Sequence, residues 1–376
     1  MREGCPGVNV VVVGGGVIGL SVAWRAAGRG MTVTVFDPQL GGGASGVAAG
    51  MLAPVTEVHY GEEALLALNL ESSRRYPGFV AELEDDSGLV TGYRASGTLT
   101  VARDADDLAA IDELVAYQQG LGLDVERLRS GELRRLEPAL APGVRGGALV
   151  AGDHQVDPRR LVLALGEGCR RRGVTLRRER VAAVERHAVL LAGGDRQPAD
   201  AVVVAAGCWS GAIEGLAPEA VVVRPVKGQI LRLRDPAAQP LVGHNLRGLD
   251  AYLVPRSDGE VVVGATVEEQ GYDTTVTGGA VHELLRAALE LVPDLGELTL
   301  VETAAGLRPG TPDNAPLLGA SGVDSVVLAA GHHRNGILLA PVTADCVVDL
   351  LHSGRTPDVI APFSPRRFDR PQRVAS

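Results

Sequence analysis

The chain has 376 residues but a single lysine, Lys227, and only 3% aromatic residues. Its other basic side chains are arginines, and because alanine, glycine and valine are also abundant, we attribute this bias to genomic composition. Acidic residues outnumber basic ones, so the formal net charge is −10. Nucleic-acid binding requires a basic face, and this charge therefore argues against a nucleic-acid partner.

Cysteine is equally scarce, and its positions exclude common cysteine chemistry. The four cysteines form no C-x-x-C pair, and they form no cluster with histidine at zinc-ligand spacing. They are Cys5, Cys169, Cys208 and Cys346. We therefore expect reduced thiols in a cytoplasmic protein, and no metal site.

A hydrophobic segment of membrane length is also missing. The apolar run of residues 8–24 is too short to span a bilayer and is interrupted by four glycines. Apolar residues nevertheless make up 45% of the chain, which is enough for a large core. At this length we expect two lobes that share an interface, without membrane contact.

The same N-terminal run contains a strand, a glycine turn and a helix. Residues 8–13 (VNVVVV) predict a buried strand, and residues 32–36 (TVTVF) predict a second one. Between them lies a G-x-G-x-x-G pattern formed by Gly14, Gly16 and Gly19. The first glycine allows a tight turn, the second lets the backbone approach a pyrophosphate, and the third permits close packing of helix on strand. The sequence therefore predicts a dinucleotide site at a helix N-terminus, which favours phosphate.

An acidic residue completes this pattern. Asp37 follows the second strand, 18 residues after Gly19, where its carboxylate can accept hydrogen bonds from the adenosine ribose hydroxyls. An acid at this position also disfavours a 2′-phosphate, and hence NADP. The motif by itself leaves FAD and NAD open.

Farther along, helical and extended patterns alternate in blocks. Helices are predicted for residues 62–86, 104–120, 130–136, 158–172, 278–291 and 337–352. Buried strands are predicted at residues 200–206 and 325–330, and short strands with a hairpin turn at 257–259 are predicted within residues 221–265. We predict a discontinuous dinucleotide-binding domain of residues 1–55, 150–222 and 300–362, a substrate-binding domain of residues 56–149 and 223–299, and a tail of residues 363–376.

From the first strand to about residue 352, the chain resembles the D-amino-acid oxidase superfamily and, within it, the glycine oxidases of thiamine synthesis (ThiO). The matching segments are VVVGGGVIGLSVAWRAA, GASGVAAGMLAP, RPVKGQ, AYLVPR, VVVGAT, AGLRPGTPDNAP and AAGHHRNGILLAP, of which the last two are long and specific. The resemblance implies non-covalently bound FAD and an α/β fold. In that fold, a Rossmann-like FAD-binding domain is joined to a substrate domain built on a mixed, mainly antiparallel sheet. It also implies a homo-oligomer, which is a tetramer in glycine oxidases.

The resemblance assigns FAD contacts to several separate segments. They are Gly14, Gly15, Gly16, Gly19, Asp37, Pro38, Ser45, Ala49, Gly50, Met51, Val181, Gly207, His332, His333, Arg334, Asn335, Gly336, Ile337 and Leu338. Val181 is implied to contact the adenine side, and Gly207 to end a strand beneath the cofactor. The N–H groups of the last segment are expected to face the flavin pyrimidine ring, where they stabilise negative charge. For the two histidines, structural hydrogen bonding is favoured over proton transfer.

Two arginines and a tyrosine form the expected substrate site. Arg308 lies in an apolar segment shaped by proline and glycine, near the end of a predicted strand, and an arginine there needs an anion. The resemblance implies that Arg308 clamps a substrate carboxylate, that Arg334 is a second active-site arginine, and that the Tyr252 hydroxyl helps to bind the carboxylate. A structural core role for Tyr252 and a structural or interdomain role for Lys227 stay open.

The implied activity is that of an FAD-dependent oxidase. The α-hydrogen of glycine or another small amine leaves as a hydride to flavin N5, dioxygen gives hydrogen peroxide, and hydrolysis of the imine gives an oxo acid and ammonia. Glycine, sarcosine and small D-amino acids are open as substrates. A dehydrogenase of the same fold, a nicotinamide-dependent reductase and a non-catalytic flavin-binding subunit are the competing hypotheses.

Overall fold

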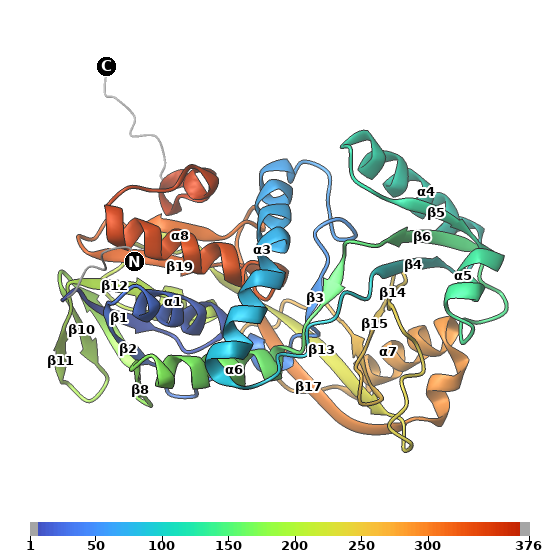
Figure 1. The fold of residues 1–376 in the computed structure, drawn as a ribbon, viewed down its shortest axis with the longest axis horizontal. Coiled ribbons are helices and arrows are strands. Elements are labelled where there is room, and N and C mark those ends of the chain that lie inside the picture. The colour runs from blue at the N-terminus through green and yellow to red at the C-terminus, as the bar shows by residue number, and fades with distance from the viewer. Residues whose placement is uncertain (1–6, 369–376) are drawn as a thin grey trace.

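A computed structural model describes residues 7–368 (Figure 1). Cys5 and residues 369–376 of the expected tail lie outside the described residues. Two sheets lie in two lobes side by side, with the long helix α3 (Glu63–Ser87) between them in the view of Figure 1. This arrangement confirms the predicted fold class.

The first sheet is mostly parallel and contains the predicted buried strands. Its strand order is β18-β19-β12-β1-β2-β8, and only β18 and β19 pair antiparallel within it. The strands are β1 (Asn9–Val13), β2 (Thr32–Phe36), β8 (Thr175–Arg177), β12 (Ala201–Val204), β18 (Leu317–Ala320) and β19 (Val326–Ala330). The central residues of β1, β12 and β19 are buried on both faces, as their continuous apolar runs require. The carboxyl ends of β1, β2 and β12 therefore meet at one edge.

Helices cover this sheet and form the larger core with it. The central helix α1 (Val17–Gly28) packs between α6 (Pro158–Arg171) and α8 (Ala340–Ser353). The start of α6 is fixed by Asp157, whose side chain accepts two backbone N–H groups at the helix start. The predicted helix bounds are confirmed here to within a few residues. The largest departure is α8, which begins three residues late, after a 3₁₀ turn at His333–Asn335.

The helix α3 belongs to this first core. Its residues Leu68, Tyr76, Phe79 and Leu83 are buried in the same cluster as Trp24 of α1. Our domain prediction places residues 56–149 in the substrate domain, and the packing of α3 differs from it. The reason is that the apolar stripe of α3 faces α6 and α8, a long-range contact that its own pattern does not specify.

The second sheet has eight strands in the order β17-β13-β16-β15-β14-β4-β6-β5. It is antiparallel except where β14 pairs with β4. The strands are β4 (Thr98–Ala102), β5 (Glu126–Arg129), β6 (Gly146–Val150), β13 (Arg224–Arg234), β14 (Asn245–Arg247), β15 (Tyr252–Pro255), β16 (Glu260–Gly264) and β17 (Thr299–Gly310). The predicted hairpin turn at residues 257–259 joins β15 to β16. β17 pairs with β13 along its length, so it belongs to this sheet and not to the 300–362 segment of the predicted FAD-binding domain.

Shorter elements complete the two lobes. The helices are α2 (Ala44–Val47), α4 (Ala105–Gly120), α5 (Ser130–Leu136) and α7 (Gly278–Leu291). A two-stranded sheet pairs β3 (Met51–Leu52) with β7 (His154–Gln155), and a three-stranded sheet contains β9 (Val181–Glu185), β10 (Ala188–Leu191) and β11 (Arg196–Pro198). The 3₁₀ helices are η1 (Gly207–Ala212), η2 (Pro218–Ala220), η3 (Pro293–Glu297), η4 (His333–Asn335), η5 (Asp358–Phe363) and η6 (Pro365–Phe368).

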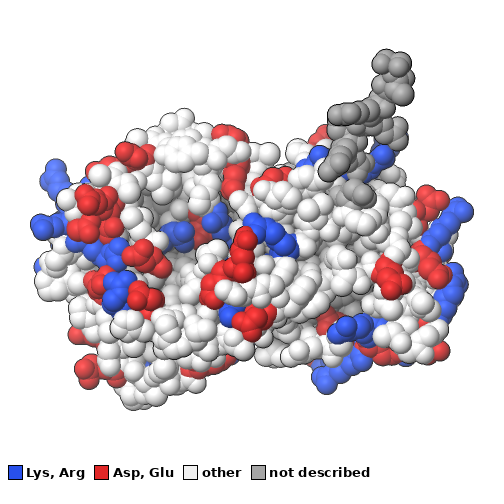
Figure 2. Space-filling view, turned by 180° about the vertical axis from the view of Figure 1, so that it is seen from behind, with Lys and Arg blue, Asp and Glu red and all other residues white. Residues whose placement is uncertain are grey.

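The surface carries both signs of charge. On the face shown in Figure 2, acidic side chains lie between the basic ones, and large areas are uncharged. Within residues 7–368, no helix combines the length and the apolar composition needed to cross a membrane.

Candidate active site

A cavity of about 820 Å³ joins the two lobes. Its wall contains the glycine turn, Asp37 and Val181, and it also contains Tyr252, Arg308 and Arg334. The volume is within the range of ligand and cofactor sites in proteins. The structure thus brings the two groups of predicted residues into the wall of one cavity.

The glycine turn follows β1 and leads into α1. The Gly14 N–H donates to the Phe36 carbonyl at 2.9 Å, which ties the turn to the end of β2. Gly19 lies against the Gly14 carbonyl, where a Cβ atom would overlap the oxygen, so only glycine permits this packing. Gly14 and Gly16 line the cavity, whereas Gly15 and Gly19 shape the turn from behind. The N-terminus of α1 therefore faces the space in which a pyrophosphate would lie.

Side chains around the turn fix its position. The Asp37 carboxylate accepts the N–H groups of Gly15 and Gln39, each at 2.6 Å. The Ser45 hydroxyl accepts the Val17 N–H at 3.0 Å. Each carboxylate oxygen of Asp37 has lone pairs left for ribose hydroxyls. Pro38 lines the cavity beside it.

The loop of residues 48–51 forms part of the cavity wall. Ala49, Gly50 and Met51 all line it, and the Gly50 carbonyl accepts the Val156 N–H at 2.9 Å. Gly50 has φ +86°, and a Cβ atom there would overlap the Val156 carbonyl. Gly207, which starts η1, also lines the cavity, and its φ is +57°.

The segment after β19 turns sharply through residues 331–336. His333 has φ +48° and lines the cavity with an unpaired Nδ1 atom. His332 Nε2 lies 3.1 Å from the Thr343 hydroxyl of α8, and burial lowers the pKa of His332 to about 3. Burial and the neighbouring Arg334 lower the pKa of His333 to about 4. Both imidazoles are neutral at pH 7, which fits structural hydrogen bonding.

Two of the expected cofactor contacts lie behind this segment. Gly336 and Ile337 line the cavity, but Asn335 and Leu338 are not among its lining residues. The Leu338 side chain is buried in the core of the first lobe, and its carbonyl accepts the Ser72 hydroxyl at 2.6 Å.

Arg308 and Tyr252 belong to the second sheet, and both side chains line the cavity. Arg308 Nη1 donates to the carbonyls of Thr266 at 3.1 Å and Lys227 at 3.3 Å. Burial raises the pKa of Tyr252, although Arg308 opposes this, so the phenol keeps its proton at neutral pH. An anion bound beside these side chains would contact the positively charged Arg308 guanidinium and the neutral Tyr252 hydroxyl.

Sequence reasoning missed an ion pair that faces these residues. Glu57 and Arg247 both line the cavity, and Arg247 Nη1 lies 2.7 Å from Glu57 Oε1. Glu57 Oε2 lies 3.8 Å from Arg334 Nε. Burial by itself raises the pKa of Glu57, but Arg247 and Arg334 together hold that pKa below its usual value. The pair joins positions 190 residues apart, so no local pattern in the sequence marks it.

Lys227 does not line the cavity. Its side chain is 1% exposed, and Nζ lies 2.6 Å from Asp273 Oδ2 and 3.8 Å from Glu268 Oε2. These contacts join β13 to the segment that follows β16. They favour the structural interpretation of this single lysine over the catalytic one.

Comparison with known proteins identifies the family. The family DAO, described as FAD dependent oxidoreductase, matches residues 9–350. The chain belongs to the DAO family. A bifunctional protein ThiO/ThiG from Synechocystis is 38% identical over 371 residues, which cover 96% of this chain and 54% of that protein. This chain therefore spans about half the length of the ThiO/ThiG proteins that it matches.

A second relative matches from end to end. Glycine oxidase from Geobacillus kaustophilus is 33% identical over 364 residues, which cover 95% of this chain and 96% of that protein. A crystal structure of glycine oxidase from the same species aligns with a TM-score of 0.88 over 95% of this chain and 98% of that one. The family is one of FAD-dependent oxidoreductases, so the cofactor of this protein is FAD, and its relatives include glycine oxidases and ThiO/ThiG proteins.

The cavity fits this cofactor. The glycine turn leaves no room for side chains where the dinucleotide would approach, and Asp37 offers acceptors to a ribose. The 48–51 loop, Gly207 and His333, whose Nδ1 atom is unpaired, line the same cavity and are available to hold the flavin ring.

Proposed function

We propose that the protein oxidises glycine and other small amines, such as sarcosine and small D-amino acids, using non-covalently bound FAD. Glycine or a small D-amino acid reacts with dioxygen and water to give the oxo acid, ammonia and hydrogen peroxide, whereas sarcosine gives methylamine in place of ammonia. One observation carries this proposal: Arg308, Tyr252 and Arg334 line the same cavity as the dinucleotide turn. The names of the relatives, glycine oxidase and ThiO/ThiG, support the choice of substrate.

The chain's own residues bind and orient the substrate. Arg308 is held by two backbone carbonyls through Nη1, which leaves the rest of its planar fork for a carboxylate. The protonated Tyr252 hydroxyl donates to the same carboxylate. Arg334 supplies a second positive charge, partly offset by Glu57. FAD, when bound, supplies the acceptor for the hydride.

The surrounding groups are not suited to removing a proton from carbon. His332 and His333 are neutral, with their pKa values lowered to about 3 and about 4. Glu57 is ionised but paired with Arg247. Hydride transfer needs no protein base at the α-carbon, which agrees with these environments.

A peroxide assay with purified protein tests the substrate. We expect peroxide from glycine, and from some of sarcosine, D-alanine and D-proline, because a difference of one methylene changes discrimination by only about 1–3 kcal/mol. Reduction of a dye without peroxide indicates a dehydrogenase of the same fold. Protein that is colourless and does not bind added FAD contradicts the proposal entirely.

Two further parts of the proposal rest on the relatives. Supply of the glycine imine for thiazole synthesis in thiamine formation is supported by the similarity to ThiO/ThiG proteins. Complementation of a ThiO-deficient strain by the gene tests it. A homotetramer is tested by light scattering, and a monomeric mass rejects it.

A further inference from the structure

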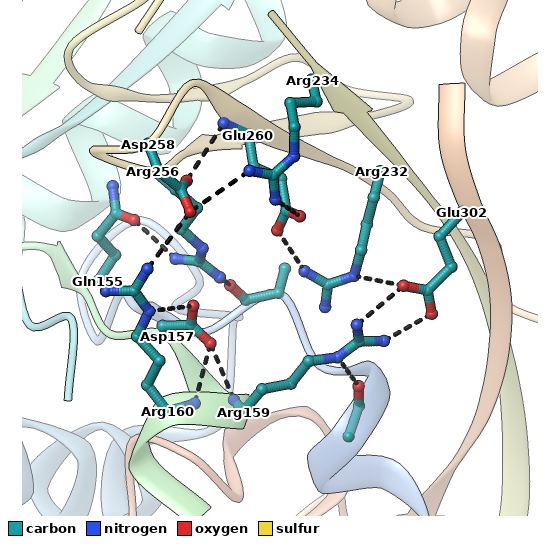
Figure 3. Close-up of polar contacts among 12 residues, drawn as sticks. Gln155, Asp157, Arg159, Arg160, Arg232, Arg234, Arg256, Asp258, Glu260 and Glu302 are labelled. Atoms are coloured by element: carbon teal, nitrogen blue, oxygen red, sulfur yellow. Dashed lines mark hydrogen bonds and ion pairs between the residues drawn. The ribbon is translucent and has the colours of Figure 1, made fainter. Parts of the chain in front are cut away.

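A buried guanidinium connects the second sheet to the cofactor cavity. Arg256 follows β15, and its side chain is 4% exposed. Its Nη1 atom donates to Gln155 Oε1 at 2.7 Å (Figure 3). Nη1 also donates to the Val156 carbonyl at 3.1 Å, and Nη2 donates to the Ala49 carbonyl. All three acceptors belong to segments outside the sheet that carries Arg256.

Ala49, whose carbonyl accepts the hydrogen bond from Arg256, is held in place by its neighbours. Ala49 is buried, and the next residue, Gly50, is bonded through its carbonyl to the Val156 N–H. Ala49 also packs in a small apolar cluster with Val254 and Val262 of β15 and β16. Arg256 therefore forms hydrogen bonds with both of the segments that meet here, which are the 48–51 loop and residues 155–156.

The other end of this connection is the strand that carries Tyr252. Tyr252 and Arg256 are four positions apart in one extended segment. The Arg256 N–H donates to the Glu260 carbonyl at 2.6 Å, and Arg94 Nη1 donates to the Pro255 carbonyl at 3.0 Å. The backbone at Arg256 is thus fixed from both sides. A planar fork that serves three acceptors in different directions suits arginine and not lysine.

We propose that Arg256 is a positioning residue, which holds the 48–51 loop at a fixed distance from the strand of Tyr252. The flavin ring held by that loop and the carboxylate held by Tyr252 then keep one relative position, and hydride transfer depends steeply on that position. The substrate part of this inference rests on the proposed function. The FAD part rests only on the family.

Neighbouring charged groups supply a matched control. The acids beside Arg256 pair with other arginines: Asp258 with Arg160 and Arg234, and Glu260 with Arg232 and Arg234 (Figure 3). The Arg234 side chain is 42% exposed and lies in the same network. Burial lowers the pKa of Arg256 to about 10, so Arg256 remains charged at pH 7. A substitution at Arg256 removes the hydrogen bonds to the 48–51 loop and residues 155–156. A substitution at Arg234 removes an arginine from the neighbouring ion pairs and leaves those hydrogen bonds intact.

The test compares Arg256→Met, Arg256→Lys and Arg234→Met. FAD affinity is measured by titrating each apoprotein with FAD, and kcat and KM are measured at saturating FAD with the best amine found. For Arg256→Met we expect FAD binding weaker by at least about tenfold, since three charge-assisted hydrogen bonds are lost. We also expect an altered visible spectrum of the bound flavin and a lower kcat. Arg256→Lys recovers part of the affinity, and Arg234→Met stays within about twofold of wild type.

Several results overturn the proposal. They are wild-type FAD affinity and spectrum in Arg256→Met, equal losses in Arg234→Met, or a lower melting temperature of the Arg256→Met apoprotein without a change in FAD affinity or kcat. If Arg256→Met is insoluble, Arg256→Lys decides, and wild-type FAD affinity and kcat in that variant reject a positioning role. Failure of both variants to fold assigns Arg256 to structure alone. FAD titration uses no amine, so an error in the proposed substrate does not affect it.

Discussion

The Arg308 guanidinium lies directly over the backbone of Gly228, and a Cβ atom at Gly228 would overlap its terminal nitrogens and its central carbon. The two residues belong to neighbouring strands, β17 and β13, whose pairing brings Val226 opposite Arg308. The absence of a side chain at Gly228 therefore creates the space in which the arginine reaches the carbonyls of Lys227 and Thr266.

Gly228→Ala is expected to displace this guanidinium. The flexible side chain of Arg308 moves before the strand does, so we expect KM for glycine to rise while FAD stays bound. Steady-state kinetics and the visible absorbance of the flavin check this. Gly278→Ala, at a position where a Cβ meets open space, is the matched control. A KM unchanged by Gly228→Ala indicates that Arg308 does not bind the substrate from this position.

Arg308→Ala removes the carboxylate clamp altogether. A charge-assisted hydrogen bond contributes about 1.5–3 kcal/mol, so KM is expected to rise by about tenfold to a hundredfold or more with FAD retained. The same kinetics measure it, and Arg74→Ala, which removes an exposed arginine, serves as the control. Unchanged kinetics in Arg308→Ala reject the clamp assignment.

The dinucleotide end of the site could be predicted because its determinants are local. The spacing of Gly14, Gly16 and Gly19 sets the turn, and Asp37 follows the adjacent strand, so neighbouring residues alone define the geometry. Helix bounds were predictable for the same reason, as at α4, where Asp104 accepts two N–H groups of the first turn. The expected Arg308 and Tyr252 positions came from resemblance, and the structure places both side chains in the cavity wall.

The remainder depends on contacts between distant positions. The pair of Glu57 and Arg247 forms only when the loop after β3 meets the end of β14, and no periodic pattern marks either residue. The packing of α3 and the pairing of β17 differ from the predicted domain bounds for a similar reason. Each has a pattern that specifies an apolar face without specifying which partner covers it.

FAD is expected to be released when the protein is precipitated with acid. Residues 331–336 contain no cysteine. Cys208 lines the cavity, but burial raises the pKa of its thiol to about 12, and the thiol form is a poor nucleophile. The absorbance of the supernatant after centrifugation measures the released flavin. Colour that stays with the pellet contradicts a non-covalent cofactor.

Glu57→Gln is expected to destabilise the protein at neutral pH by about 1–3 kcal/mol, because Arg247 loses a charged partner. Arg247 and Arg334 depress the folded-state pKa of Glu57, so its stabilising contribution is present above the ordinary pKa of 4.5. That contribution is lost as pH falls through the lower folded value. Melting curves of wild type and variant should therefore differ at pH 7 and converge in acid. Glu283→Gln, an exposed change on α7, is the control, and a difference independent of pH would falsify the assignment.

Asp153→Asn is expected to show the opposite dependence on pH. Asp153 accepts the N–H groups of Val55 and Thr56, just before Glu57, and burial raises its pKa to about 7. Between about pH 4 and pH 7 the unfolded carboxyl ionises while the folded one keeps its proton, so wild type loses stability as pH rises through this window. Asn cannot ionise, so between pH 5 and pH 7 the free energy of unfolding of the wild type should fall relative to that of the variant. The exposed change Asp85→Asn is the control. If instead the wild type gains on the variant over this range, the two backbone N–H groups stabilise the carboxylate more than burial destabilises it, and the raised pKa is wrong.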